Sequence, residues 1–132
     1  MAKQYMLDTD ICSYVIKNFN DSVGSNYNAH FDDCCISAMT YGELIFWAQK
    51  KNSPRLSESI RLLVNQLDIV PLDELAMEHY ARIRVGLENA GTPIGNMDML
   101  IAASALSAGA RLITHNTKHF AKIKGLKVED WL

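Results

Sequence analysis

The sequence lacks the features that would place a protein in or beyond a membrane. Hydrophobic residues make up 48% of its 132 residues, but no apolar run approaches the roughly 18 residues of a membrane-spanning helix. The N-terminus lacks the pattern of a secretory signal peptide. The three cysteines, Cys12, Cys34 and Cys35, are an odd number without a CxxC motif, which is a poor disulfide framework. We therefore expect a cytoplasmic protein without membrane contact.

An excess of positive charge is also absent. Thirteen Lys and Arg against fifteen Asp and Glu give a net charge of −2, so the composition does not indicate a nucleic-acid-binding protein. This average conceals a local bias near the C-terminal end. The basic residues gathered there are Arg111, Lys118, Lys122, Lys124 and Lys127. Such a run is usually a solvated face, and it gains meaning only beside a reactive centre.

Internal repeats, low-complexity tracts and interdomain linkers are absent too, and a length of 132 residues is usual for one domain. We therefore predict a single domain over 1–132. The predicted strands are 3–7, 34–37, 68–72, 111–115 and 126–130. The predicted helices are 9–17, about 21–31, 39–50, 53–66, 74–90 and 96–109. This alternation indicates an α/β domain, with a parallel sheet of four to five strands covered on both faces.

Two carboxylates stand where the first predicted strand ends. In the segment YMLDTDICSY the apolar run stops at Asp8, and Asp10 follows after Thr9. Ligands of open α/β sheets bind outside the carboxyl ends of the strands, which places Asp8 at the binding edge. Asp10 could equally serve as the cap of the helix that follows, and both roles stay open at this point.

Two further acids lie on predicted helices. Glu43 lies on an apolar stripe, where an unpaired carboxylate is costly to desolvate, and a salt bridge to a core arginine is the alternative. Asp98 lies in a first turn, where it could simply favour the helix dipole, and its neighbours at helical spacing offer no cation. With Asp8, these acids can converge at one sheet edge, where they would take up protons unless a cation neutralised them. Mg²⁺ and Mn²⁺ prefer such oxygen ligands and promote phosphodiester hydrolysis.

Four segments resemble, in order, the signature regions of PIN-domain ribonucleases, and most closely those of VapC-type toxins of type II toxin–antitoxin modules. They are MLDTDICSY, ISAMTYGEL, GTPIGNMDMLIAASAL and LITHNTKHF. The resemblance extends over nearly the whole chain. It implies a three-layer α/β/α fold with strand order 3-2-1-4-5 and an endoribonuclease that depends on Mg²⁺ or Mn²⁺.

The resemblance also implies roles for individual residues. The acidic metal ligands implied by position are Asp8, Glu43 and Asp98. Thr9 would position Asp8 or the scissile phosphate. Thr114 and Asn116 fall in the family's Thr-Asn-Asn region, where a polar side chain completes the site. The RNA-binding lysines predicted beside that site, because they follow the fourth strand, are Lys118, Lys122 and Lys124.

The implied partners are an RNA substrate and a VapB-type antitoxin, which blocks the cleft and binds operator DNA. The chain would touch that DNA only through the antitoxin, and it would form a homodimer and larger toxin–antitoxin assemblies. By analogy with the family, the substrate is a tRNA, with the anticodon loop of initiator tRNA as the specific expectation.

Three positions depart from the usual pattern of the family. Asp10 stands where Asn is usual, and His115 stands within the Thr-Asn-Asn region. His119 stands before Phe120, where a fourth acid is usual. Its loss bears on the number of metal ions, because a two-metal site needs more negative charge than three carboxylates easily supply. Asp10 would restore some of that charge.

Other hypotheses explain parts of the pattern. A PIN-fold binding module without catalysis would agree with His119. A haloacid-dehalogenase-like phosphatase would use Asp8 as nucleophile, but no later acid pair and lysine follow in the required order. A receiver domain would end its third strand with an aspartate, where Pro71 is found. His115 and His119 could face a zinc ion, but no cysteine is near them in sequence.

The helix predicted over 39–50 carries apolar residues around most of its circumference. They are Tyr41, Leu44, Ile45, Phe46, Trp47 and Ala48. A surface helix buries only about a third to a half of its perimeter, so apolar surface should remain exposed. A second copy of the chain or an antitoxin helix could cover it. Alternatively, the helix over 53–66 folds back onto it.

Overall fold

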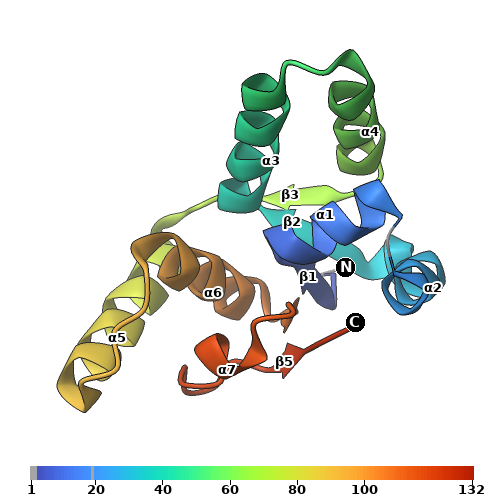
Figure 1. The fold of residues 1–132 in the computed structure, drawn as a ribbon. Helices are drawn as coiled ribbons and strands as arrows, with labels where there is room; N and C mark the ends of the chain where they lie inside the picture. Colours follow the sequence, from blue (N-terminus) through green and yellow to red (C-terminus); the bar gives the residue numbers. More distant parts are fainter. Residues whose placement is uncertain (1–2, 19) are drawn as a thin grey trace.

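The computed structural model describes residues 3–18 and 20–132. Within these ranges one parallel sheet has the strand order β3-β2-β1-β4-β5 (Figure 1), which confirms the predicted topology. The strands are β1 (Tyr5–Leu7), β2 (Cys34–Ser37), β3 (Asp68–Val70), β4 (Arg111–Ile113) and β5 (Val128–Glu129). The strand β3 stops just before Pro71, since proline cannot donate a backbone hydrogen bond to the sheet.

The helices lie close to the predicted ranges. They are α1 (Thr9–Lys17), α2 (Asp21–His30), α3 (Ala38–Lys51), α4 (Pro54–Asn65), α5 (Glu74–Ala90), α6 (Asn96–Ala108) and α7 (Thr117–Phe120), with a 3₁₀ turn, η1 (Phe31–Asp33). The caps explain this agreement. The Asp73 carboxylate accepts from the Ala76 N–H at 2.9 Å, and α5 ends at Gly91 with φ of 70°. None of the helices described is long and apolar enough to cross a membrane.

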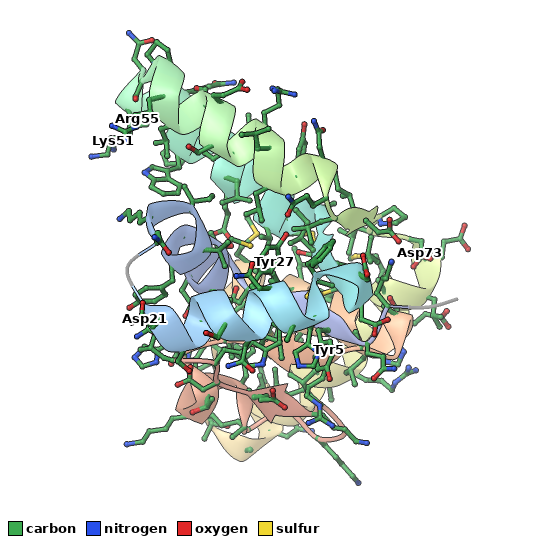
Figure 2. The ribbon with its side chains drawn as sticks, turned by 90° about the vertical axis from the view of Figure 1, so that its right-hand side faces the viewer. Tyr5, Asp21, Tyr27, Lys51, Arg55 and Asp73 are labelled. Atoms are coloured by element: carbon green, nitrogen blue, oxygen red, sulfur yellow. The ribbon has the colours of Figure 1, made fainter. Side chains whose placement is uncertain are left out.

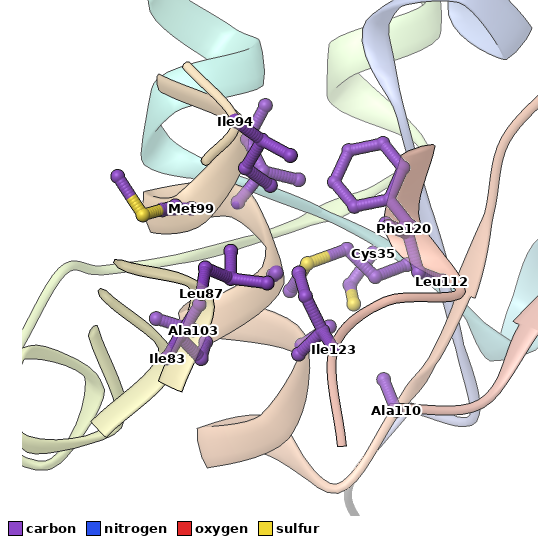
Figure 3. Packing of buried hydrophobic residues seen from close by; sticks show 14 residues of the cluster. Cys35, Ile83, Leu87, Ile94, Met99, Ala103, Ala110, Leu112, Phe120 and Ile123 are labelled. Atoms are coloured by element: carbon purple, nitrogen blue, oxygen red, sulfur yellow. The ribbon is translucent and has the colours of Figure 1, made fainter. Parts of the chain in front are cut away.

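Side chains that alternate along the strands build two separate cores, one on each face of the sheet. Met6, Cys35 and Leu112 belong to the core shared with α5 and α6, part of which Figure 3 shows. Leu7 and Ile113 belong to the core shared with α1 to α4. This period of two, with both faces buried, is what a parallel sheet between two helical layers requires. The predicted α/β/α architecture is therefore confirmed.

The apolar helix α3 is covered only in part. Its residues Leu44 and Ala48 share a core with Ile60 and Leu63 of α4, so α4 does fold back along α3. The Phe46 side chain nevertheless stays 63% exposed. The predicted packing of α4 is therefore confirmed on one side of this helix, and the predicted exposed apolar surface remains on another. The partner expected to cover that surface stays a prediction.

Candidate active site

Asp8 lies at the junction between β1 and α1, where the chain passes from the sheet edge into a helix. It is the N-cap of α1, and its Oδ1 accepts a hydrogen bond from the Thr9 N–H at 2.8 Å. Its Oδ2 accepts from the Thr114 hydroxyl, also at 2.8 Å. Its own N–H donates to the Ile113 carbonyl at 2.8 Å, so β4 holds the backbone as well. The residue is only 8% exposed.

This environment changes the acidity of Asp8. Burial raises the pKa of the carboxyl from 3.8 to about 7, and the negative charge of Asp10 adds to this rise. The bonds from Thr114 and Thr9 offset part of it, while the charge of Asp98 raises the pKa further. Asp98 is therefore close enough to Asp8 to repel it. Burial also raises the pKa of Asp10.

Asp10 connects α1 to the turn that follows β4. Its Oδ1 accepts from the Ile11 N–H at 2.7 Å, and its Oδ2 accepts from the His115 N–H at 3.1 Å. The Thr114 hydroxyl lies 3.5 Å from the same Oδ2, but 2.8 Å from Asp8. Because a hydroxyl has one proton, it donates to Asp8. The cap of α1 is Asp8, and Asp10 lies beside it. We refer to Asp8 and Asp10, together with Glu43 and Asp98, as the acid group.

Glu43 joins the site from α3. Its Oε1 accepts a hydrogen bond from the Thr9 hydroxyl, whose oxygen lies 3.2 Å from that of Thr40. Thr40 is itself fixed because its N–H donates to the Ser37 cap at 3.0 Å. No arginine pairs with Glu43 among the residues described, so the structure does not support the salt-bridge alternative.

Asp98, in the first turn of α6, has a partner that the sequence did not reveal. The Nε2 atom of His119 lies 2.9 Å from its Oδ2. Asp98 therefore has an imidazole partner that its neighbours at helical spacing did not indicate. The reason is topological, because α7 brings His119 to α6 from outside the helix whose spacing was considered. His115 instead contacts Asp130, with Nδ1 2.9 Å from Oδ2. The two histidines thus contact different acids, which does not favour a shared zinc ion.

The remaining predicted residues divide between two places. The Asn116 N–H donates to the Thr114 hydroxyl oxygen at 3.1 Å, while the Asn116 side chain is exposed at the start of α7. Lys118 is exposed on α7 near these residues. Lys122 and Lys124 lie farther along the chain and line a hollow with α5. The structure therefore separates the three predicted RNA-binding lysines.

The donor atoms of this site suit a hard cation. Carboxylate and hydroxyl oxygens dominate it, which is the ligand type that Mg²⁺ and Mn²⁺ prefer. Within 3–18 and 20–132, however, no three Asp, Glu, His or Cys side chains are grouped as ligands of one ion. Glu43 and Asp98 bond to Thr9 and His119 instead. Asp8 is thus repelled by Asp10 and Asp98, and Glu43 is linked to Asp8 through Thr9. The hydrogen-bond partners of these carboxylates are residues of the chain.

Fold and site together define an α/β protein with an acidic centre at the carboxyl edge of a parallel sheet. The chain belongs to the PIN-domain family, whose model matches residues 5–126. It is 38% identical to the tRNA(fMet)-specific endonuclease VapC of Shigella flexneri, over 97% of this chain and 98% of that protein. It is 37% identical to ribonuclease VapC1 of Haemophilus influenzae, over 96% and 97% of the two chains.

Solved structures agree with this assignment. VapBC2 from Rickettsia felis, bound to a DNA fragment from its promoter, superposes with a TM-score of 0.90 at 32% identity, covering 97% of this chain and 98% of that one. DNA-bound VapBC from Salmonella typhimurium gives a TM-score of 0.87 at 33% identity, covering 98% and 99%. The predicted family is therefore confirmed.

Proposed function

We propose that this chain is the ribonuclease toxin of a toxin–antitoxin module and that it hydrolyses phosphodiester bonds within RNA. The observation that carries the proposal is the acid group around Asp8, at the end of β1, in a chain that matches VapC ribonucleases over almost its full length. A buried carboxyl such as that of Asp8, whose pKa is raised by burial and by the charge of Asp10, is more typical of a catalytic centre than of a structural ion pair.

The proposed catalytic ligands are Asp8, Glu43 and Asp98, and the proposed cofactor is Mg²⁺ or Mn²⁺. A bound ion of this type polarises a phosphoryl oxygen and lowers the pKa of its bound water, which is the chemistry that RNA hydrolysis needs. The chain orients the ligands through hydrogen bonds. The Thr9 N–H and the Thr114 hydroxyl each donate to one oxygen of Asp8. The Thr9 hydroxyl donates to Glu43. His119 holds one oxygen of Asp98.

We further propose that the substrate is a tRNA, with the anticodon loop of initiator tRNA as the specific expectation. The VapC proteins of Shigella flexneri and Salmonella typhimurium, 38% and 34% identical to this chain, are tRNA(fMet)-specific endonucleases. The test is incubation of purified protein with initiator tRNA and with an elongator tRNA, in Mg²⁺, in Mn²⁺ and in EDTA. Sequencing of the cleaved ends locates the bond.

Cleavage with either metal, and no cleavage in EDTA, supports the proposal. The variant Asp8→Asn should lose this cleavage. Cleavage that persists in EDTA would contradict the metal, because chelation removes the ion but leaves the protein groups. Tight RNA binding without cleavage under every metal condition would instead identify the chain as a binding module. That outcome would agree with the presence of His119 where the family usually has an acid.

The proposed protein partner is a VapB-type antitoxin, in a complex that reaches operator DNA through the antitoxin. Several structural neighbours are VapBC complexes, and two of them are bound to DNA. Co-expression with the gene found beside this one should yield a stable complex without ribonuclease activity. Light scattering of the toxin alone and of the complex tests the expected homodimer and the larger assembly.

A further inference from the structure

A second candidate site lies on the layer of the molecule that contains α5 and α6. It is a hollow of about 470 Å³ between α5, the end of α6 and the segment that follows α7. A volume of this size is within the range of small-ligand sites. Its rim carries His79 and Arg82 from α5, and Lys122 and Lys124 from the segment after α7. We refer to it as the basic hollow.

The cations of the basic hollow are not neutralised by the protein. Within the described part of the chain, no Asp or Glu lines the hollow, and Arg82, Lys122 and Lys124 form no salt bridge. By contrast, Arg84 of the same helix pairs with Glu88 at 2.8 Å. Clustered cations without carboxylate partners repel one another, and an anionic ligand would relieve this repulsion.

One of these cations is held in place. The Nη2 atom of Arg82 lies 3.2 Å from Nδ1 of His79. A guanidinium can only donate, so Nδ1 of the imidazole accepts this bond. The remaining N–H groups of Arg82 are left for a ligand, and they form the planar fork that binds phosphate oxygens best.

The floor of the basic hollow is apolar. Ile83 and Leu87 of α5 line it together with Ile123. All three belong to the core on this face of the sheet, where Figure 3 labels them. A rigid apolar floor below a cationic rim suits a ligand with anionic groups along one edge and a flat, weakly polar body. A nucleotide has this character, since its phosphate is charged and its base can lie against apolar side chains.

The position of the hollow relative to the acids favours a nucleic-acid strand over a free nucleotide. The helix α6 carries Asp98 in its first turn and Leu106, which lines the hollow, in its last turn. These residues are about 12 Å apart along the helix axis. On the other side, His119 contacts Asp98, and Lys122 follows one turn later in the chain. The same two segments therefore lead from the acid group to the hollow.

We propose that the basic hollow binds a nucleotide of the RNA strand that flanks the cleaved bond. Its phosphates would lie on Arg82, Lys122 and Lys124, with the sugar and base over Ile83 and Leu87. This inference rests on the proposed ribonuclease function and adds a binding site outside the acid group. It adds Arg82, on a different helix, to the predicted basic residues, and it excludes Lys118 from the hollow.

The test measures RNA binding to a chain that cannot cleave. In a Glu43→Gln background, the triple variant Arg82→Gln, Lys122→Gln, Lys124→Gln is compared with the triple variant Lys50→Gln, Lys51→Gln, Arg55→Gln. The control removes the same charge around the junction of α3 and α4, where Figure 2 labels Lys51 and Arg55. All six side chains are exposed, so both triples should fold, which circular dichroism checks.

Fluorescence anisotropy with a labelled single-stranded RNA is then recorded over a series of salt concentrations. The hollow triple should weaken binding at least about tenfold and reduce the slope of log K against log salt by about 2, because each lost phosphate contact on a single strand contributes about 0.7. The control triple should change neither quantity appreciably. Equal losses in both triples, or an unchanged slope in the hollow triple, would overturn the proposal.

Cleavage assays separate this inference from the proposed function. With Glu43 restored, the hollow triple should raise KM for RNA with little change in kcat, because the hollow does not touch the acids. If the parent protein cuts no RNA, the proposed function itself fails. If the parent cuts RNA and the triple has an unchanged KM, only the hollow assignment fails. Competition by a free mononucleotide as effective as by RNA would overturn strand binding. Lost inhibition by the antitoxin, with RNA cleavage unchanged, would assign the hollow to an acidic protein segment instead.

Discussion

Replacing Asp8 by Asn should stabilise the metal-free protein at alkaline pH. The carboxyl is 8% exposed, and burial together with the charge of Asp10 raises its pKa from 3.8 to about 7. The folded state therefore holds a proton that the unfolded chain has already lost between these two values. Its contribution to the free energy of unfolding is fully favourable below about pH 4 and declines as the pH rises toward 7. An Asn side chain does not titrate and avoids this decline.

The size of the effect follows from the shift. About three pKa units at 1.36 kcal/mol each correspond to roughly 4 kcal/mol above pH 7. Between about pH 5 and pH 8 the parent protein should lose about 3 kcal/mol that the variant keeps. The Asn oxygen can replace one acceptor of Asp8, and the Thr114 hydroxyl can turn to accept from the new amide. Weaker hydrogen bonds should cost about 1 kcal/mol at every pH.

Urea unfolding in EDTA, at about pH 5 and at about pH 8, measures this difference in the free energy of unfolding between the parent and Asp8→Asn. Asp21→Asn, an exposed acid at the start of α2 (Figure 2), removes the same charge away from the site and should show the pH dependence of the parent. Adding Mn²⁺ should then stabilise the parent more than Asp8→Asn, because ligand binding to the folded state adds to stability. If the free energy of unfolding changed equally in Asp8→Asn and in the parent between the two pH values, the pKa of Asp8 would not be the one raised at this site.

Three further predictions use the same structure. Glu43→Gln and Asp98→Asn should each abolish RNA cleavage in gel assays with an unchanged circular dichroism spectrum, and full activity of either would remove that residue from the catalytic group. Thr114→Val should lower the free energy of unfolding by about 1 to 3 kcal/mol, because it leaves the buried Asp8 oxygen without its donor; equal urea midpoints would contradict this. Phe46→Glu should fold normally, since Phe46 is 63% exposed, but lose antitoxin capture or dimer formation; a variant that keeps both would place the interface elsewhere.

The fold was predictable because strand and helix signals agree along the chain. Short apolar strands alternate with capped helices, and Ser53, Asp73 and Gly91 mark helix boundaries that the structure reproduces. The turn η1 and the helix α7 were not predicted. They span three and four residues, which is too short for a hydrophobic period to appear.

Of the candidate site, the sequence predicted the residues but not their partners. Asp8 was identifiable because it ends a buried strand, and Asp10 because it follows closely. The bond from Thr9 to Glu43 joins residues 34 positions apart, and the contact between His119 and Asp98 joins two helices. Helical spacing describes neighbours on one helix only, so contacts between elements depend on how the helices pack. The basic hollow was missed for the same reason, since Arg82 lies on α5, far in sequence from the two lysines.

Two of the three substitutions that distinguish this chain from the family pattern, Asp10 and His119, act together on the charge of the site. His119, where an acid is usual, puts a hydrogen-bonding imidazole on Asp98 in place of another negative charge. Asp10, where Asn is usual, adds a carboxylate beside Asp8, and the Thr114 hydroxyl lies within 3.5 Å of both acids. Negative charge is therefore concentrated at the end of β1 and reduced at the start of α6. A single cation near Asp8 would relieve most of this repulsion, whereas a second cation near Asp98 would face the imidazole. We therefore expect one metal ion rather than two.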